Sequence, residues 1–425
     1  MNEKLFQYIW QHLYFNVQHL KTASGQQVEI IFRGTLNTNQ GPDFLNARVR
    51  IDETIWVGNI ELHLEEKDWV RHGHQNDFLY QNVILHVVAG KLEEQPVTRI
   101  PTISLEGRIP KHLLARYSSL YKNPESIACK PLLNNLPSIT FIQCLDRMLV
   151  EKWEHRFSYM QSLLKINRFH FEEAFWWMLA GNFGTPVNTQ AFEMMARSIP
   201  FKILQSVRHD ATILEALLMG QIGLLDQVFG DPYPAYLKTE YRFLKHKHQL
   251  KKGIFPVSFL RMRPANFPTI RLVQLASLMN KHERLFSEII DCNSLNDLYG
   301  ILSAQATGYW ENHYHFGQPT LKKQKMLGKE MINNLLINTI LPVLYGYGKI
   351  NRIESMQLRA MDWLRMLPPE NNAVTRLFIG TPFPNESAYD SQALIHLKKN
   401  YCNQKRCLEC AVGHKLLAAV NANYK

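Results

Sequence analysis

Three polar side chains alternate along the segment GNIELH, at Asn59, Glu61 and His63. Alternate residues of a strand face opposite sides of a sheet, so these side chains would share one face while apolar residues occupy the other. Asp43 lies upstream, in a GPD turn that leads into the preceding strand. Carboxylates on neighbouring strands supply the hard oxygen ligands that a divalent ion prefers, and a third residue can orient or deprotonate a water molecule. We therefore predict that Asp43 and Glu61 bind Mg²⁺ or Mn²⁺ and that His63 positions the water.

A second group of potential ligands follows in the segment RHGHQND. His72 and His74 alternate there, and Asp77 lies shortly after them. Imidazole and carboxylate groups together bind transition metals, so these residues, with or without His63, form an alternative zinc-dependent hydrolase site. The competing interpretation is a polar loop whose histidines are solvated. His86 lies inside the apolar segment VILHVVA and is predicted to be a core residue satisfied by one hydrogen bond.

Three of the six cysteines lie near the C-terminus in a C-x4-C-x2-C pattern, at Cys402, Cys407 and Cys410. Three thiolates and a fourth donor form a common set of ligands for zinc or for an iron–sulfur cluster. The fourth donor is either His414 or Cys129. The alternative is a set of reduced thiols near a frayed terminus. The two remaining cysteines lie in helical patterns and are predicted to be core residues.

The chain is basic, with a formal net charge of +11 and a pI near 9.2. This excess favours a polyanionic partner, and we predict nucleic acid; the alternative is a basic surface that serves solubility. The segment RMRPANFPTIR places Arg261, Arg263 and Arg271 around two prolines at the start of a predicted helix. A helix N-terminus with nearby arginines is a natural phosphate site, so these three residues are predicted to bind phosphate.

The predicted metal ligands need a sheet to position them, and the N-terminal part of the chain predicts one. A helix over 3–20 precedes strands over 28–32, 47–51 and 56–64, a helical or loop segment near 78–80, a buried strand over 83–88 and an edge strand over 102–105. In the strand over 56–64, the face that carries Trp56, Ile60 and Leu62 is predicted to form core.

Helical patterns replace strand patterns after Pro137. They cover 138–164, 171–180, 189–207, 211–228, 269–289, 326–347, 353–366 and 391–400. We therefore predict a protein of the α+β or α/β class with three parts. They are an αβββαβ module over 1–135, a mostly all-α domain over 136–390, and a C-terminal helix with a Cys-rich segment over 391–425.

The sequence gives no sign of secretion or of a membrane anchor. The segment MNEKLFQYIWQHLYF carries charge and glutamine where a secretory signal has an apolar stretch. No run of 18 apolar residues is present, so no membrane span is predicted. Six cysteines in 425 residues do not form a disulfide scaffold. These features predict a cytoplasmic protein.

The stretch from GPDF to GNIELH resembles the PD-(D/E)xK nuclease superfamily, with the likeness covering roughly residues 5–105. In that family the Pro-Asp and Glu-x-Lys motifs lie on adjacent strands of an αβββαβ core. The resemblance implies that Asp43 and Glu61 are metal ligands and that the protein hydrolyses phosphodiester bonds in DNA or RNA. His63 stands where the family has lysine, and a neutral imidazole supplies no permanent positive charge. This departure leaves open a catalytically inactive nucleic-acid-binding or scaffold protein.

Two further resemblances reach beyond this module. The segments GPDF, GNIELH, DWVRHGHQND, VILHVV, RMRPANFPTIR and CNQKRCLEC resemble an uncharacterised bacterial family, a domain of unknown function, which implies no activity. Cys129 with the three C-terminal cysteines resembles the iron–sulfur staple of RecB-like nucleases, in which the cluster ties the chain end to the nuclease core. Here the C-terminal spacing differs, and Cys129 follows the nuclease-like motifs instead of preceding them.

Overall fold

The computed structural model describes residues 1–251 and 255–418, and it divides into two compact units. Unit 1 comprises Met1–Asp146, Ala373–Pro384 and the chain from Leu394 onward, whereas unit 2 comprises Arg147–Asn372 and Asn385–Ala393. The segment predicted as a separate C-terminal part over 391–425 therefore folds largely with the N-terminal module; its last seven residues lie outside the described chain.

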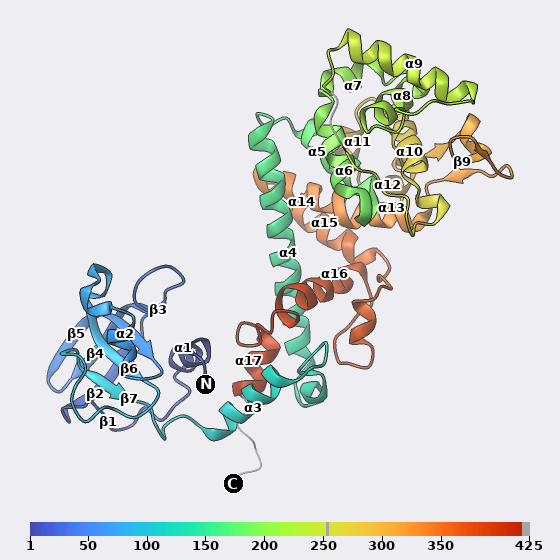
Figure 1. Ribbon diagram of the computed structural model, residues 1–425. Coiled ribbons are helices and arrows are strands. Elements are labelled where there is room, and N and C mark those ends of the chain that lie inside the picture. Colours follow the sequence, from blue (N-terminus) through green and yellow to red (C-terminus); the bar gives the residue numbers. More distant parts are fainter. Residues whose placement is uncertain (252–254, 419–425) are drawn as a thin grey trace. The chain divides into compact units, whose positions relative to one another are not determined.

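Unit 1 is built on one mixed sheet, drawn in blue and cyan in Figure 1. Its strands are β1 (Leu20–Lys21), β2 (Gln27–Phe32), β3 (Thr35–Leu36), β4 (Phe44–Ile51), β5 (Thr54–His63), β6 (Val83–Val88) and β7 (Thr102–Ser104). The spatial order is β1-β2-β4-β5-β6-β7, and β3 pairs with β4. Neighbouring strands are antiparallel from β1 to β5, whereas β5, β6 and β7 are parallel. A parallel pair requires a crossover, and here the segment between β5 and β6 supplies it.

The described part of unit 1 also contains four α-helices that lie wholly within it. They are α1 (Glu3–His12), α2 (Asp68–Arg71), α3 (Lys111–Lys122) and α17 (Ala411–Ala418). The side chain of Asn2 caps α1 by accepting a hydrogen bond from the backbone N–H of Leu5. The predicted helix over 3–20 is too long, because Leu13 adopts a left-handed conformation with φ 51° and ends the helix.

Strand β5 passes from solvent into the core along its length. Residues 54–57 are exposed, and Gly58 and residues 60–63 are buried. The expectation that Trp56 lies in the core is wrong, because its side chain is 43% exposed. The reason is register: β6 pairs with residues 59–63 only, so the first half of β5 extends past its neighbour. Strand β6 is buried throughout, as predicted for a central parallel strand.

The remainder of the described chain is mostly helical. Its helices are α4 (Ser138–Ile166), α5 (Phe171–Phe183), α6 (Thr185–Ser198), α7 (Phe201–Val207), α8 (Ala211–Gln221), α9 (Pro232–Lys247), α10 (Pro268–Lys281), α11 (Leu285–Asp291), α12 (Leu295–Ile301), α13 (Lys329–Leu335), α14 (Leu341–Ile350), α15 (Glu354–Met366) and α16 (Ala388–Leu397). Four short strands accompany them: β8 (Gln305–Ala306), β9 (His313–His315), β10 (Gln318–Pro319) and β11 (Lys325–Met326).

The predicted α+β class is confirmed, and several predicted helices are interrupted. The pattern over 189–207 breaks at Pro200, which cannot donate a helical hydrogen bond. The pattern over 326–347 is divided by a π-helical turn at Leu336–Ile340. Among the described residues, no helix is long and apolar enough to cross a membrane.

Candidate functional site

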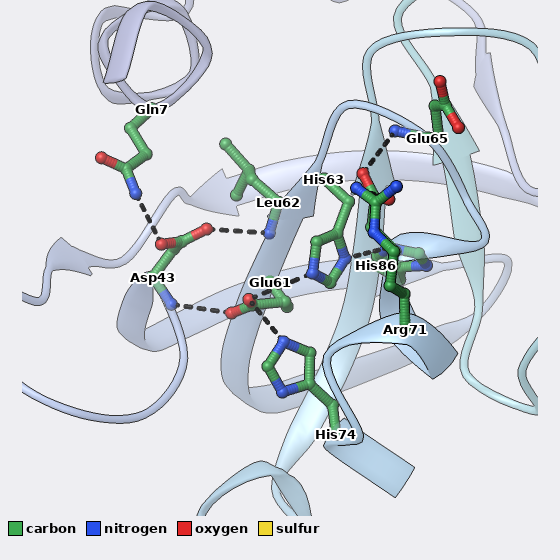
Figure 2. Close-up of polar contacts among 10 residues, drawn as sticks. Gln7, Asp43, Glu61, Leu62, His63, Glu65, Arg71, His74 and His86 are labelled. Carbon is green, nitrogen blue, oxygen red and sulfur yellow. Dashed lines mark hydrogen bonds and ion pairs between the residues drawn. The ribbon is translucent and has the colours of Figure 1, made fainter. Parts of the chain in front are cut away.

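The carboxyl groups of Asp43 and Glu61 are interlocked through the backbone. The N–H of Asp43 donates to Oε2 of Glu61 at 3.0 Å, and the N–H of Leu62 donates to Oδ2 of Asp43 at 3.0 Å. Gln7, from α1, donates to the other oxygen of Asp43 at 2.7 Å. Figure 2 shows this chain of contacts from α1 to β5. The two acidic residues singled out in the sequence therefore lie together, and each holds the other in place.

Two imidazoles face the remaining oxygen of Glu61. Its Oε1 lies 3.6 Å from Nε2 of His63 and 3.4 Å from Nε2 of His74 (Figure 2). Both Nε2 atoms are buried and have no hydrogen-bond partner within the described chain. Buried polar atoms are rarely left unsatisfied, so this convergence needs an explanation.

The spacing of these three atoms suits a metal ion. Tetrahedral ligands at about 2.0–2.1 Å from zinc lie roughly 3.3–3.4 Å from one another. The distances of 3.4 and 3.6 Å to Glu61 are close to that edge length. His72 joins the group, because His63, His72 and His74 each offer a ring nitrogen within 4.8 Å of the others. Glu61 thus lies beside His63 and His74, and His72 joins these two histidines in a group of three potential ligands.

His86 orients the most deeply buried of these ligands. Its Nε2 lies 2.9 Å from Nδ1 of His63, and both side chains are buried. If Nε2 of His63 is to present its lone pair to a metal, Nδ1 must carry the proton and donate it to His86. The prediction that His86 is a core residue with one hydrogen bond agrees with this contact. The sequence did not reveal that its partner would be His63.

Burial sets the protonation of the group. Loss of hydration and, second to it, the nearby charge of Asp43 together raise the pKa of Glu61 to about 9. Burial likewise raises the pKa of Asp43 to about 6. Burial and the neighbouring histidines lower the pKa of His63 to about 3, and burial lowers that of His74. The imidazoles of His63 and His74 are therefore neutral at pH 7, which is the form that binds metals.

The site runs from the core to the surface. The side chains of His63, Glu61 and His74 are 1%, 7% and 11% exposed, and His72 is exposed. The ring of Tyr80 stacks on His74 with centroids 3.8 Å apart, which fixes that imidazole from the outside. His72 is therefore the member of the group that is exposed to solvent.

Asp77 does not take part in this convergence. Its carboxylate accepts a hydrogen bond from the backbone N–H of Leu79 and so caps the helical turn Phe78–Tyr80. Trp69, which the sequence did not single out, is buried among the rings of His63, His74 and His86, with centroid distances of 5.3–6.3 Å. An aromatic ring packed against three imidazoles restricts their rotation.

The predicted cysteine ligands also come together, in unit 1. Cys129, Cys402, Cys407 and Cys410 line one small cavity, although Cys129 is distant from the others in sequence. His414 is directed elsewhere: its Nδ1 lies 2.8 Å from the hydroxyl of Tyr8, and its Nε2 lies 3.3 Å from that of Tyr14.

Cys144 and Cys292 are both buried, as predicted for core residues. The sequence did not anticipate that Cys144 hydrogen-bonds to Cys410 and so adjoins the cluster.

The three arginines predicted to bind phosphate have different surroundings in unit 2. Arg261 and Arg263 are exposed, whereas Arg271 is buried. The guanidinium of Arg271 donates to Gln274 at 2.9 Å and to Asn266 at 2.5 Å, and burial lowers its pKa to about 10. Arg271 therefore fastens the loop to α10, and only Arg261 and Arg263 are available to a ligand.

Replacing Glu61 with glutamine should stabilise the metal-free protein at pH 8. The folded-state pKa of Glu61, about 9, exceeds the ordinary 4.5, so its contribution to stability is lost as pH rises from 4.5 through 9. Glutamine keeps the acceptor for Asp43 and carries no charge. With chelator present, we expect a gain of about 1–3 kcal/mol in the free energy of unfolding at pH 8, and less at pH 5. The exposed Glu53→Gln is the control; equal pH profiles for Glu61→Gln and wild type would contradict the buried carboxylate.

Removing the acceptor on His86 should weaken metal binding without removing a ligand. Partners of ligating histidines typically account for about 10–100-fold in metal affinity, so His86→Phe should lower the affinity for Zn²⁺ by about that factor. His86→Gln, whose carbonyl oxygen can still accept from His63, should recover part of the loss. Competition titrations with a chromophoric chelator measure both variants, and unchanged affinity in His86→Phe would show that the His63–His86 contact has no bearing on metal.

Comparison with known proteins identifies the family. The family model described as "Protein of unknown function (DUF2851)" matches residues 3–373, which include the whole Asp43–His86 site and Cys129. No curated protein and no solved structure gives a significant match. The chain therefore belongs to the DUF2851 family of proteins of unknown function.

Proposed function

We propose that unit 1 is a metal-dependent phosphodiesterase that acts on nucleic acid. The observation that carries the proposal is the approach of two unpartnered imidazole nitrogens, on His63 and His74, to the same oxygen of Glu61. Two imidazoles and a carboxylate leave one side of a metal open for water, as in catalytic zinc sites. A divalent ion held there lowers the pKa of a water molecule and stabilises charge on a phosphoryl oxygen.

The donor set bears on which metal is bound. Imidazole nitrogens suit zinc and iron, whereas Mg²⁺ prefers oxygen ligands and retains much of its water. Because His63 and His74 face Glu61, we favour Zn²⁺ or Mn²⁺ over Mg²⁺. This assignment places His63 among the ligands and combines the Asp43–Glu61 pair with the histidine group that the sequence suggested as an alternative.

The other residues have roles that follow from their positions. Asp43 positions Glu61, since its backbone N–H binds one carboxylate oxygen. His72 is the exposed member of the group, so it is suited to accept the proton of an attacking water molecule.

The order of the strands supports phosphodiester chemistry. Antiparallel β2, β4 and β5 are followed by parallel β6, with Asp43 just before β4 and Glu61 on β5. This arrangement resembles the αβββαβ core of the PD-(D/E)xK nucleases. The net charge of +11 adds long-range attraction for a polyanion. Histidine at position 63 in place of lysine remains the principal departure.

Activity should depend on the Glu61–His74 group. We expect Mn²⁺- or Zn²⁺-supported cleavage of fluorescent single- or double-stranded DNA or RNA, reduced to background by Glu61→Gln and by His74→Ala. Asp77→Asn, next to the site but outside the group, should retain activity. His63→Lys is informative: loss of activity and of metal binding supports a ligand role, whereas retained activity indicates that the residue acts as lysine does in the resembled family.

Failure of the catalytic proposal has a distinct signature. Binding of nucleic acid without cleavage under every metal, together with equal metal affinity in wild type and Glu61→Gln, would favour an inactive binding protein. Titration calorimetry with Mn²⁺ and Zn²⁺ supplies the metal measurement, so catalysis and metal binding are judged separately.

Nucleic-acid affinity should depend on the exposed arginines of unit 2. Arg261→Ala and Arg263→Ala should weaken binding to all sequences, and each lost phosphate contact should reduce the slope of log K against log salt by about 0.7–0.9. Arg271→Ala should instead lower the unfolding temperature, because Arg271 is buried and bonded to Asn266 and Gln274. Fluorescence anisotropy between low and moderate salt tests this; an unchanged slope in both exposed variants would remove the loop from the binding surface.

A further inference from the structure

The four-cysteine cavity lies in unit 1 and involves none of the residues of the proposed hydrolase site. Cys129 precedes the helical turn Lys130–Asn135, and Cys402 ends the π-helical turn Lys398–Cys402. Cys407 lies in the next loop, and Cys410 directly precedes α17. None of these four cysteines forms a disulfide. Two parts of the chain more than 270 residues apart thus contribute cysteines to the lining of one cavity.

We propose that Cys129, Cys402, Cys407 and Cys410 bind one structural zinc ion as four thiolates. All four cysteines line the same cavity, and four thiolates are a donor set typical of structural zinc sites. Four thiolates form a closed tetrahedral zinc site, with no open position for a substrate. The two candidates for the fourth ligand are thereby reduced to Cys129.

The surroundings of His414 support this choice. Both of its ring nitrogens lie within hydrogen-bond distance of tyrosine hydroxyls, those of Tyr8 and Tyr14. His12 packs against the same imidazole, with ring centroids 4.6 Å apart. Turning His414 toward the cysteines would break both hydrogen bonds and this ring contact. Cys129 requires no such change, because it already lines the cavity.

Positive charge near the cavity compensates the thiolates. A zinc ion with four thiolates carries a formal charge of −2, which is costly to bury without nearby cations. Lys405 lines the cavity, and Lys398 lies on the π-helical turn that ends at Cys402. Arg406 also lines the cavity. These basic residues lie within the same C-terminal segment as three of the ligands.

Close backbone packing holds Cys407 and Cys410 in position. A Cβ on Gly413 would lie 2.1 Å from the carbonyl oxygen of Cys407, so only glycine allows the loop to pack on α17. Cys410 directly precedes α17. The backbone N–H groups at the N-terminus of a helix favour a thiolate. Cys144 hydrogen-bonds to Cys410 but does not line the cavity, so we assign it to the support of a ligand and not to the ligand set.

The ion would fasten the C-terminal segment to the rest of unit 1. Leu417, on α17, belongs to the same hydrophobic core as Leu120 of α3, and Cys129 and Leu408 pack against that core. Hydrophobic packing already brings α17 and α3 together. Zinc would add metal–thiolate bonds between the C-terminal segment and Cys129, and these bonds would stabilise the folded state.

Metal analysis of protein purified without air tests the proposal. To keep the hydrolase site from contributing, the background is the double variant Glu61→Gln/His74→Ala. We expect about one zinc per chain in this background. In it, Cys129→Ser and Cys407→Ser should lose the zinc, whereas Cys144→Ser, Cys292→Ser and His414→Gln should retain it.

Substitution with Co²⁺ tests the thiolate site in protein that retains all its cysteines, so the result does not depend on whether a cysteine variant folds. Replacing zinc with Co²⁺ in the unmutated-cysteine background should give the intense visible bands of a tetrahedral site and the near-ultraviolet bands of several cobalt–thiolate bonds. Four results would overturn the proposal: no metal and no cobalt–thiolate bands; iron with acid-labile sulfide; zinc lost in Cys144→Ser but retained in Cys129→Ser; or zinc lost in His414→Gln. Activity of the hydrolase site has no bearing on any of these outcomes.

Discussion

Among the residues that the structure describes, no lysine or arginine forms an ion pair with the buried carboxyl group of Glu61, and much of unit 1 is arranged around that constraint. Its ion-pair partners among the described residues are two histidines, His63 and His74. Burial and the proximity of Asp43 raise the pKa of Glu61 to about 9, and burial keeps the imidazoles neutral. A carboxyl in such a position is destabilising when ionised unless a cation joins it. The group therefore has the electrostatic character of a cation site.

The sheet changes from antiparallel to parallel pairing at β5, and this change positions the residues around Glu61. Because β5 and β6 run parallel, Glu61 lies opposite His86 in register, and His86 can reach His63 from the neighbouring strand. The antiparallel step from β4 to β5 brings the turn at Asp43 beside Glu61. The crossover between β5 and β6 carries His72 and His74, and Trp69 packs against the ring of His74. The sheet thus brings together site residues from the turn at Asp43, from β5, from the crossover and from β6.

Unit 1 is completed by the end of the chain. The segment from Leu394 onward folds with the N-terminal module, and α17 packs against α3 through a shared core that includes Leu120 and Leu417. His414 on α17 bonds to Tyr8 of α1. Since α1 also supplies Gln7 to Asp43, the C-terminal segment supports the same helix that helps to hold the acidic pair.

The sequence alone predicted the longer strands of the sheet, many of the helices and most of the candidate ligands, although it did not predict α3 or α9. Alternation in GNIELH placed Glu61 and His63 on one face, and the apolar run VILHVV identified a central strand. These patterns are local, so they can be read without tertiary information. The limits of the elements were less certain, as the early end of α1 at Leu13 illustrates.

Only the tertiary structure decided which residues meet. Sequence periodicity could not show that Trp56 extends past β6, because the length of the neighbouring strand decides that. It could not choose between Cys129 and His414, since that choice depends on packing between segments far apart in the chain. Nor could it separate the buried Arg271 from the exposed Arg261. The sequence specifies the chemistry of each side chain. Which side chains lie close together depends on long-range contacts that only the folded chain creates.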